Sequence, residues 1–371
     1  MKFTTTTGEL QRVLSKVSSV VPTKSTMPIL ENMLFDLLNN TLTITATDLD
    51  ISQTISLEVK GTEDGKIAIP SKRLLDTVRA LPDTQVVFSI DTTTNKIKIT
   101  TGNGEYNLTG ESAKEFPSAP PFKSTEEIIF ESAVIKRIIQ RTVFAVSTDE
   151  LRPAMMGVLL QPKGSDLRAV STDGHRLVKF TYKLAKASGL KRDIIIPAKA
   201  LNIISKSIEG GEVKMSMNET HVKFEFDKIV LVSRLIDETY PNYESVIPTE
   251  NEKSMTVDRE QMSSAIRRVA LYASATTHQI KLGITKSALT VSAQDIDFGG
   301  EAKEKIDCDY SSDDLDIGFN SGYLHDILSH LEAKQVTFKF SSSTRAGIVS
   351  PSGEKTDEDV LMLVMPVRLN A

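Results

Sequence analysis

The sequence contains one cysteine, Cys308, among 371 residues. A single thiol excludes an intrachain disulfide and any metal site built from several cysteines, which suits a reducing compartment. Apolar runs are also short, because none approaches the ~18 residues that a membrane-spanning helix requires. We therefore expect a cytoplasmic protein that has no membrane partner.

Ligand and nucleotide motifs are missing as well. The five histidines, at positions 175, 221, 278, 325 and 330, show no zinc-site spacing such as HExxH. Neither a glycine-rich dinucleotide loop nor a phosphate-binding P-loop occurs. We expect no metal and no cofactor.

An excess of positive charge is also lacking. The chain has 44 Lys and Arg against 49 Asp and Glu, a net charge of −5. The usual nucleic-acid binder neutralises phosphates with a positive surface, so this balance argues against that class. The argument is weaker for a protein that gathers its basic residues on one surface.

What the sequence does have is an internal repeat. An alternating, strand-like run ending in aspartate occurs three times, at Asp48, Asp173 and Asp295, roughly 120 residues apart, which is a typical domain length. The sequence around Asp173 predicts a turn between two strands. Only this middle copy continues with Gly-His-Arg, so any special role of those residues occurs once per chain.

Each repeat has the same order of predicted elements. A longer amphipathic helix opens it, with apolar stripes that begin at Leu10, Ile135 and Met262. A shorter helix begins near residues 71, 198 and 321, and period-two strands surround both helices. Short turns between successive strands indicate mostly antiparallel sheets with helices on one face, an α+β class.

Proline-containing joints separate the repeats. They occupy residues 115–121 and 240–248. We place the domains at residues 1–122, 123–250 and 251–371. Three similar modules in a row predict a curved or closed array.

Several stretches of the chain are distinctive in combination. They are Met1-Lys2-Phe3, Pro28-Ile29-Leu30, Thr47-Asp48-Leu49, Thr172-Asp173-Gly174-His175-Arg176-Leu177, Tyr240-Pro241-Asn242-Tyr243 and Val364-Met365-Pro366-Val367-Arg368-Leu369. Together they resemble the bacterial DNA sliding clamps, the β subunits of replicative DNA polymerases. The similarity covers the whole chain and implies a ring of six domains, built by a head-to-tail homodimer around double-stranded DNA.

The resemblance also implies a function and its partners. The protein would be a processivity factor rather than an enzyme, and it would tether the replicative polymerase, other polymerases and repair proteins through short peptides. Loading would need a separate clamp loader ATPase, because this chain has no P-loop. Basic helix faces turned toward the hole would explain how an acidic chain meets DNA.

Three sets of residues follow by position from this resemblance. The peptide pocket would contain Arg152, Met155, Thr172, Gly174, His175, Arg176, Leu177, Pro241, Val246, Leu363, Val364, Met365, Pro366, Val367 and Arg368. DNA would be met by Arg12, Lys16, Lys24, Arg73, Arg79, Arg137, Arg141, Lys199 and Arg267. The dimer contact would include Tyr106, Leu108, Leu271, Tyr272, Asp297 and Glu301, with Asp295 and Glu304 beside the acidic residues.

This chain departs from the family pattern in two places. Gly102 and Gly104 stand where some relatives have arginines facing the acidic side of the dimer contact, which leaves Lys96 and Lys98 as the basic candidates. Ser245 stands where some relatives have a basic pocket residue.

The residues alone leave other interpretations of the middle loop open. Asp173, His175 and Arg176 form a plain turn, a binding loop, or the acid, base and cation of an enzyme acting on a small substrate. Acid–base catalysis needs a pocket and a partner, and no nucleophile motif such as GxSxG accompanies the loop.

Two further features also have a purely structural interpretation. Basic helix faces are usually just solvated, although Arg12 with Lys16 and Arg137 with Arg141 repeat one i, i+4 spacing in two modules. The apolar run at residues 360–367 is the last core strand, or, because Pro366 ends strand pairing, partly the wall of an apolar groove.

Overall fold

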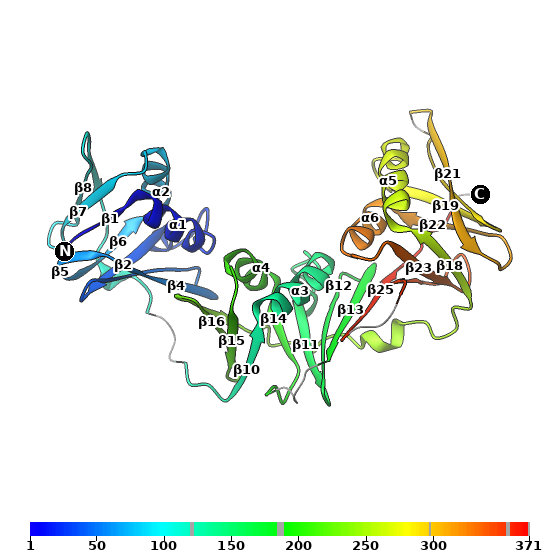
Figure 1. Ribbon diagram of the computed structural model, residues 1–371, viewed down its shortest axis with the longest axis horizontal. Helices are drawn as coiled ribbons and strands as arrows, with labels where there is room; N and C mark the ends of the chain where they lie inside the picture. Colours follow the sequence, from blue (N-terminus) through cyan, green and yellow to red (C-terminus); the bar gives the residue numbers. More distant parts are fainter. Residues whose placement is uncertain (119–121, 184–188, 297, 354–356, 370–371) are drawn as a thin grey trace. The chain divides into compact units, whose positions relative to one another are not determined.

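A computed structural model describes residues 1–118, 122–183, 189–296, 298–353 and 357–369 (Figure 1). The chain forms two compact units by its internal contacts. One contains Met1–Lys136 with Lys199–Leu235, and the other contains Arg137–Ala198 with Ile236–Ala371. The second sequence repeat therefore contributes to both units.

The α-helices occur where the apolar stripes predict them. Three longer helices open the repeats and three shorter ones follow. Among the described residues these are α1 (Thr7–Val17), α2 (Ser71–Ala80), α3 (Ser132–Thr142), α4 (Ala198–Ser207), α5 (Arg259–Val269) and α6 (Ser321–Ser329).

Local chemistry explains where several helices begin. Thr6, Asp258 and Asn320 precede α1, α5 and α6, and each side chain accepts a hydrogen bond from a backbone N–H of the first turn. The apolar stripe of α1, from Leu10 to Val17, is buried. One face of each such helix therefore belongs to the core and the opposite face stays polar.

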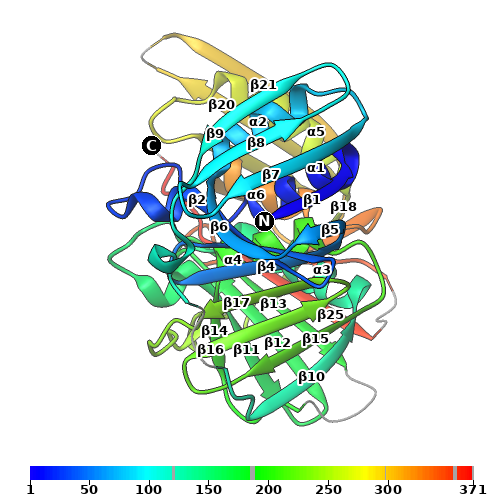
Figure 2. The ribbon, with the colours of Figure 1, turned by 90° about the vertical axis from the view of Figure 1, so that its left-hand side faces the viewer.

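All paired strands are antiparallel, as the short turns predicted. In the first unit a five-stranded sheet has the order β5 (Lys60–Glu63), β1 (Lys2–Thr6), β7 (Gln85–Asp91), β8 (Lys96–Thr100) and β9 (Glu105–Thr109). Helices α1 and α2 lie behind these strands in the view of Figure 2. The sheet thus has helices on one face, which confirms the α+β class.

The first unit also contains an eight-stranded sheet. Its order is β10 (Glu126–Glu131), β15 (Glu212–Met217), β16 (His221–Phe226), β17 (Ile229–Arg234), β4 (Ile51–Glu58), β3 (Thr41–Thr47), β2 (Asn32–Leu38) and β6 (Gly65–Pro70). The β17–β4 pair joins the last strand of the second repeat to the first repeat.

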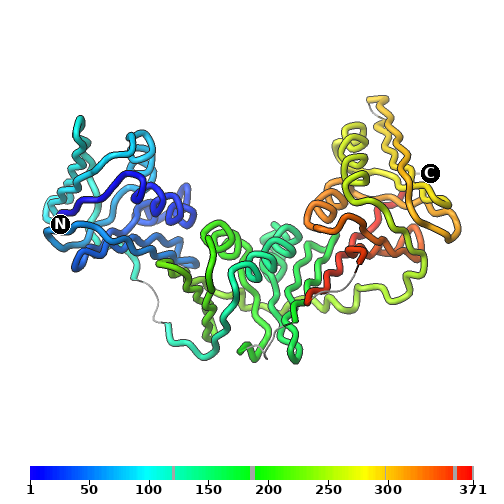
Figure 3. The backbone as a smooth tube through the Cα atoms, in the orientation of Figure 1, coloured from blue at the N-terminus to red at the C-terminus, as the bar shows by residue number. Residues whose placement is uncertain are grey.

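The second unit is built on a twelve-stranded sheet. Strand β25 pairs with β13, which joins the end of the third repeat to the second, and Figure 3 shows their backbones running side by side. The order is β14 (Ile194–Pro197), β11 (Gly157–Lys163), β12 (Asp166–Thr172), β13 (Arg176–Lys183), β25 (Glu358–Val364), β24 (Gly347–Pro351), β23 (Gln335–Phe340), β18 (Lys253–Asp258), β21 (Gly300–Tyr310), β20 (Ala288–Asp295), β19 (Gln279–Thr285) and β22 (Leu315–Asn320).

Candidate functional site

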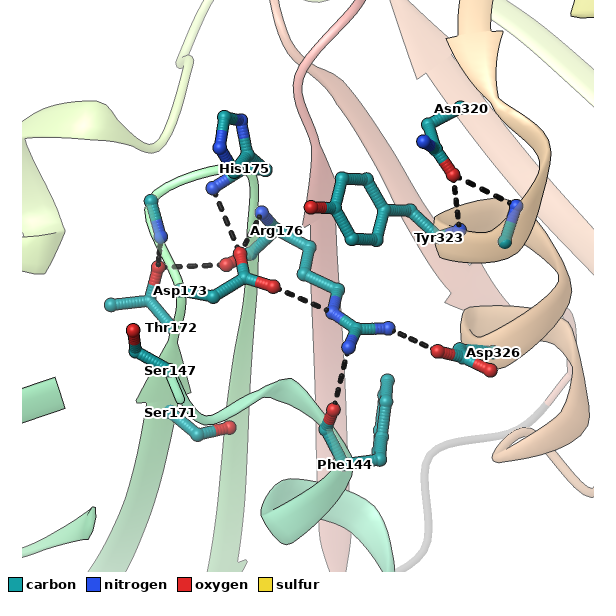
Figure 4. Close-up of polar contacts among 12 residues, drawn as sticks. Phe144, Ser147, Ser171, Thr172, Asp173, His175, Arg176, Asn320, Tyr323 and Asp326 are labelled. Atoms are coloured by element: carbon teal, nitrogen blue, oxygen red, sulfur yellow. Dashed lines mark hydrogen bonds and ion pairs between the residues drawn. The ribbon is translucent and has the colours of Figure 1, made fainter. Parts of the chain in front are cut away.

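The turn between β12 and β13 is shaped by its own side chains (Figure 4). Thr172 Oγ1 donates to Arg176 O at 2.7 Å and accepts from Gly174 N at 3.1 Å. Asp173 Oδ1 accepts from the backbone N–H groups of His175 and Arg176, both at 2.9 Å. Gly174 has φ +90°, a conformation that favours glycine. The loop therefore has one well-defined conformation.

The first repeat forms the same turn without Gly-His-Arg. Thr47 Oγ1 donates to Ile51 O at 3.0 Å, and Asp48 Oδ1 accepts from Ile51 N at 2.7 Å. Leu49 takes the place of Gly174 with φ +81°. Thr and Asp thus have a structural role in both repeats, and the middle copy differs through His175 and Arg176.

Arg176 is buried and its donors point in three directions. Its Nε donates to Asp173 Oδ2 at 3.1 Å, one terminal nitrogen donates to Phe144 O at 2.7 Å, and the other donates to Asp326. The guanidinium also lies 4.9 Å from the ring centroid of Tyr323. The resemblance implies that Arg176 belongs to the peptide pocket, and in the structure its guanidinium is occupied by contacts within the fold.

These contacts also bear on the enzyme interpretation. Asp173 uses its oxygens on the main chain of His175 and Arg176 and on the Arg176 guanidinium. The imidazole of His175 stacks on Tyr323, with ring centroids 5.7 Å apart. The arrangement favours a rigid loop over a proton-transfer pair.

An apolar floor lies beside the loop. Leu177 on β13 stands opposite Leu363 on β25, and both are buried. Tyr240 packs against this cluster, and burial raises the pKa of its hydroxyl above the ordinary range. The other buried members are Leu159, Val170, Ile195, Tyr243 and Ala346.

Exposed residues adjoin members of this floor and of the loop along the chain. Val246 in η5 (Tyr243–Val246) is 54% exposed and Met365 is 41% exposed. Arg152, Pro241 and His175 are also exposed. Exposed apolar and basic side chains therefore come from the same segments as the buried leucines and the loop.

Arg152 and Met155 frame the loop from another segment. Arg152 donates to Asp173 O at 3.2 Å and to Asp149 Oδ2 at 2.8 Å. Met155 is buried in the 3₁₀ helix η4 (Pro153–Met156). A Cβ added at Gly174 would lie 3.0 Å from a terminal nitrogen of Arg152, so a larger residue there would displace the Arg152 guanidinium.

The C-terminal segment leaves the sheet and is fastened on both sides of Pro366. Strand β25 ends at Val364, and Met365 N donates to His175 O at 2.8 Å. Val367 N then donates to Gly318 O on β22 at 2.9 Å. The strand interpretation of residues 360–367 is therefore confirmed up to Val364, and the tail that follows lies beside the loop; that it forms the wall of an apolar groove stays a prediction.

Sequence reasoning missed several neighbours of the loop. Tyr323 and Asp326 come from α6, about 150 positions away from Arg176. Phe144 precedes the loop, and Leu151, which is 90% exposed, adjoins Arg152. No local pattern marks these residues, because their roles depend on a partner distant in the chain.

The residues expected to meet DNA differ in exposure. Arg12 is exposed and lies 4.0 Å from Glu209, whereas Lys16 donates to Glu209 at 2.6 Å. The hydrogen bond from Lys16 is the main cause of the lowered pKa of Glu209. Arg137 pairs with Glu358 and Lys199 pairs with Asp48, while the remaining exposed members are Lys24, Arg73, Arg79 and Arg267.

Arg141 does not fit the expected solvent-facing stripe. Only 9% of its side chain is exposed, because it donates to His330 O and pairs with Glu332 at 3.0 Å. The i, i+4 spacing placed it correctly on the helix, but the residues that follow α6 contact it there. Helical spacing cannot reveal what covers a face.

The predicted dimer residues lie on an edge strand of the first unit and, in the second unit, on a 3₁₀ helix and strand β21. Tyr106 and Leu108 are on β9, the edge strand of the five-stranded sheet. Leu271 and Tyr272, in η6 (Ala270–Tyr272), are 81% and 48% exposed. Glu301 is exposed on β21, and Asp297 lies outside the described residues. Sequence reasoning missed Ile296 and Phe298, which are 79% and 88% exposed.

The part of the chain that the structure describes contains no cluster of His, Cys, Asp and Glu that could hold a metal ion. Burial raises the pKa of Cys308, so its thiol is a weaker acid than a free cysteine. Within the described ranges, no helix is both long enough and apolar enough to cross a membrane.

Three family models match successive parts of the chain. They describe the DNA polymerase III beta subunit, with its N-terminal domain over residues 1–120, its central domain over 130–242 and its C-terminal domain over 244–368.

Individual relatives are similar over their full length. The beta sliding clamp of Chlamydia muridarum is 30% identical, with 100% of both chains covered. That of Pseudomonas aeruginosa is 29% identical, also with 100% of both chains covered. A DnaN sliding clamp from Bartonella birtlesii bound to griselimycin matches at 31% identity with a TM-score of 0.94 and 100% of both chains covered. The C. crescentus beta sliding clamp matches at 30% identity with a TM-score of 0.92, covering 100% of this chain and 99% of that one.

Proposed function

This chain belongs to the DNA polymerase III beta subunit family, the beta sliding clamps, and on that premise we propose that it is a non-enzymatic processivity factor. Two copies form a closed ring around double-stranded DNA. The ring tethers the replicative polymerase, and other polymerases and repair proteins, through short peptides.

The observation that best supports a ring is an incomplete third sheet junction. Inside the chain, the last strand of one repeat pairs with the preceding repeat twice, as β17 with β4 and as β25 with β13. The third pair of this kind would join β9 to β21. Strand β9 is an edge, and β21 meets β18 only through Cys308 to Tyr310. A second copy of the chain supplies both missing partners, and a head-to-tail arrangement closes the ring.

The apolar surface between the loop and the C-terminal tail suits a peptide. Val246 and Met365 offer exposed apolar contacts beside the buried Leu177 and Leu363. Burying two large anchors contributes roughly 1.5 to 3 kcal/mol each, and ordering the peptide offsets much of that. Affinity on the order of micromolar follows, which allows partners to exchange.

A tether of this kind increases the concentration of a bound polymerase near its primer end. Even a weak peptide contact is sufficient, because the ring holds the complex on the DNA. Loading requires an ATP-driven partner that opens the ring. The acidic net charge does not oppose this role, since topological binding does not depend on phosphate neutralisation.

The test is retention on nicked circular DNA at high salt. The protein, loaded by a clamp loader, should remain on circles in molar salt and leave once the circle is cut, because phosphate contacts weaken with salt whereas linkage does not. Equal salt-dependent loss from circular and linear DNA would refute topological binding.

A further inference from the structure

Two contacts inside the chain join a basic side chain to the C-terminal end of a helix. Lys16, in the last turn of α1, donates to the carbonyl of Ser207, the last residue of α4, at 3.2 Å. It also pairs with Glu209 at 2.6 Å. Arg141, in the last turn of α3, donates to the carbonyl of His330 directly after α6 and pairs with Glu332 at 3.0 Å.

The two contacts are copies of one arrangement. Lys16 and Arg141 occupy the same position on the opening helix of successive repeats. The accepting carbonyls likewise share a repeat position, and each glutamate follows two residues later. The last carbonyls of a helix lack intrahelical partners and form the negative end of its dipole. A cation placed there donates hydrogen bonds to these carbonyls and is attracted to the dipole. We call this arrangement the helix-end clamp.

A third copy of the basic residue is Arg268 on α5. It stands in the third repeat where Lys16 and Arg141 stand in the first two, and its side chain is 57% exposed. Its Nε and a terminal nitrogen donate to Glu304 at 2.8 and 2.6 Å. In the order of repeats, the helix that should end against Arg268 is α2, whose last residue, Ala80, is exposed.

We propose that Arg268 of one copy holds the C-terminal end of α2 of a second copy and so forms the helix-end clamp of the subunit junction. The proposal rests on the homodimer proposed above. Arg268 lies three residues before Leu271, which is 81% exposed. On the other side, α2 borders a cleft of about 1050 Å³ that also includes Leu108 on β9. Both partners therefore adjoin the residues expected at the dimer contact.

The helix-end clamp at the subunit junction differs in one component from the two helix-end clamps within the chain. Glu209 and Glu332 follow the accepting carbonyls of α4 and α6, but the matching position after α2 is Pro82. Arg268 instead has Glu304 from its own chain. The subunit junction thus lacks the carboxylate that the second helix contributes elsewhere, so it is held less tightly than the junctions within the chain.

The test compares dimer dissociation constants of full-length variants by sedimentation velocity over a dilution series. Arg268→Ala should weaken the dimer by about tenfold or more, as expected for loss of a hydrogen bond to a charged group. Arg267→Ala is the matched control, because it removes the same charge from the neighbouring exposed position. Arg268→Lys should stay within about threefold of the unsubstituted chain, since lysine serves in the first clamp.

A gain of affinity separates a direct contact from an effect through Glu304. Pro82→Glu restores the missing carboxylate on an exposed position, and it should tighten the dimer about threefold, the scale of an exposed ion pair. In the Arg268→Ala background this gain should vanish, because the new carboxylate at position 82 then has no arginine to pair with.

The outcomes distinguish this inference from the ring itself. Equal dissociation constants for Arg268→Ala and Arg267→Ala in a dimeric protein would refute the contact between Arg268 and α2 and leave the proposed ring unaffected. A gain from Pro82→Glu that persists without Arg268 would also refute that contact. An unsubstituted chain that stays monomeric at micromolar concentration would refute both the homodimer and the contact between Arg268 and α2.

Discussion

Replacing Arg176 with lysine should loosen the turn between β12 and β13 although the charge is kept. The guanidinium donates from three nitrogens to Asp173, Asp326 and Phe144 O, which lie in different directions. A lysine ammonium is a single point on a flexible stem, so it cannot span these acceptors at once. We expect it to keep one of them.

The size of the effect depends on which contacts are shielded from water. The Asp326 side chain is 44% exposed, so solvent screens that pair and its loss costs less than about 1 kcal/mol. The side chains of Arg176 and Asp173 are only 10% and 13% exposed. Losing one shielded hydrogen bond to a charged group costs about 2 kcal/mol. Loss of the cation–π contact of the guanidinium with Tyr323 adds about 0.5 kcal/mol.

Hydrogen exchange measures this loosening directly. The amides of His175 and Arg176 both donate to Asp173, so they exchange when the turn opens. A loss of about 2.5 kcal/mol, without counting the screened Asp326 pair, should speed their exchange roughly 70-fold. Amides of the matching turn, at Leu49 and Ile51, should be unaffected and serve as the internal control.

A second variant controls for general loss of an arginine near the loop. Arg152→Lys alters a side chain that is 46% exposed, so exchange at His175 and Arg176 should change less than about threefold. If Arg176→Lys exchanged at the same rate as the unsubstituted protein, the guanidinium network would not hold the turn, and Arg176 would be available to a peptide after all.

Three further predictions concern the tail, the dimer and acid stability. Deleting residues 365–371 removes Met365 beside the apolar floor and should abolish binding of polymerase-derived peptides in fluorescence anisotropy, with the dimer unchanged by sedimentation; undiminished binding would move the site elsewhere. Leu271→Ala with Tyr272→Ala removes exposed apolar area at the proposed contact and should give folded monomers by circular dichroism and sedimentation, so a double variant that stays dimeric would contradict that placement. Lys16 lowers the pKa of Glu209. The Glu209 carboxylate should therefore stabilise the fold at pH values above its ordinary pKa of 4.5, and this contribution should be lost as the pH falls through the lowered pKa. The thermal midpoint of Glu209→Gln should therefore lie below that of the unsubstituted protein at pH 7 and converge with it in acid, and a difference that persisted unchanged at pH 3 would count against the pair.

Local patterns were sufficient to locate most elements. The stripe beginning at Leu10 predicts α1 because a helix buries one face, and the alternation at Val86, Phe88 and Ile90 predicts β7 because successive strand residues face opposite sides. The turn at Asp173 follows from side chains that bond to their own backbone. These features depend on residues a few positions apart, so the sequence alone determines them. The boundaries near residues 122 and 250 stay predictions.

Tertiary structure alone decided which surfaces these elements present. Arg141 and Arg176 were placed on the correct helix and loop, yet both are buried. Residues of the third repeat lie against them: His330, directly after α6, against Arg141, and Asp326 and Tyr323 of α6 against Arg176. The pairing of strands from different repeats is also absent from any local pattern, since a strand's period shows which face is apolar but not which edge it will meet. Whether a charged side chain meets solvent, DNA or a carbonyl therefore depends on contacts between residues far apart in the chain, and only the folded structure brings those residues together.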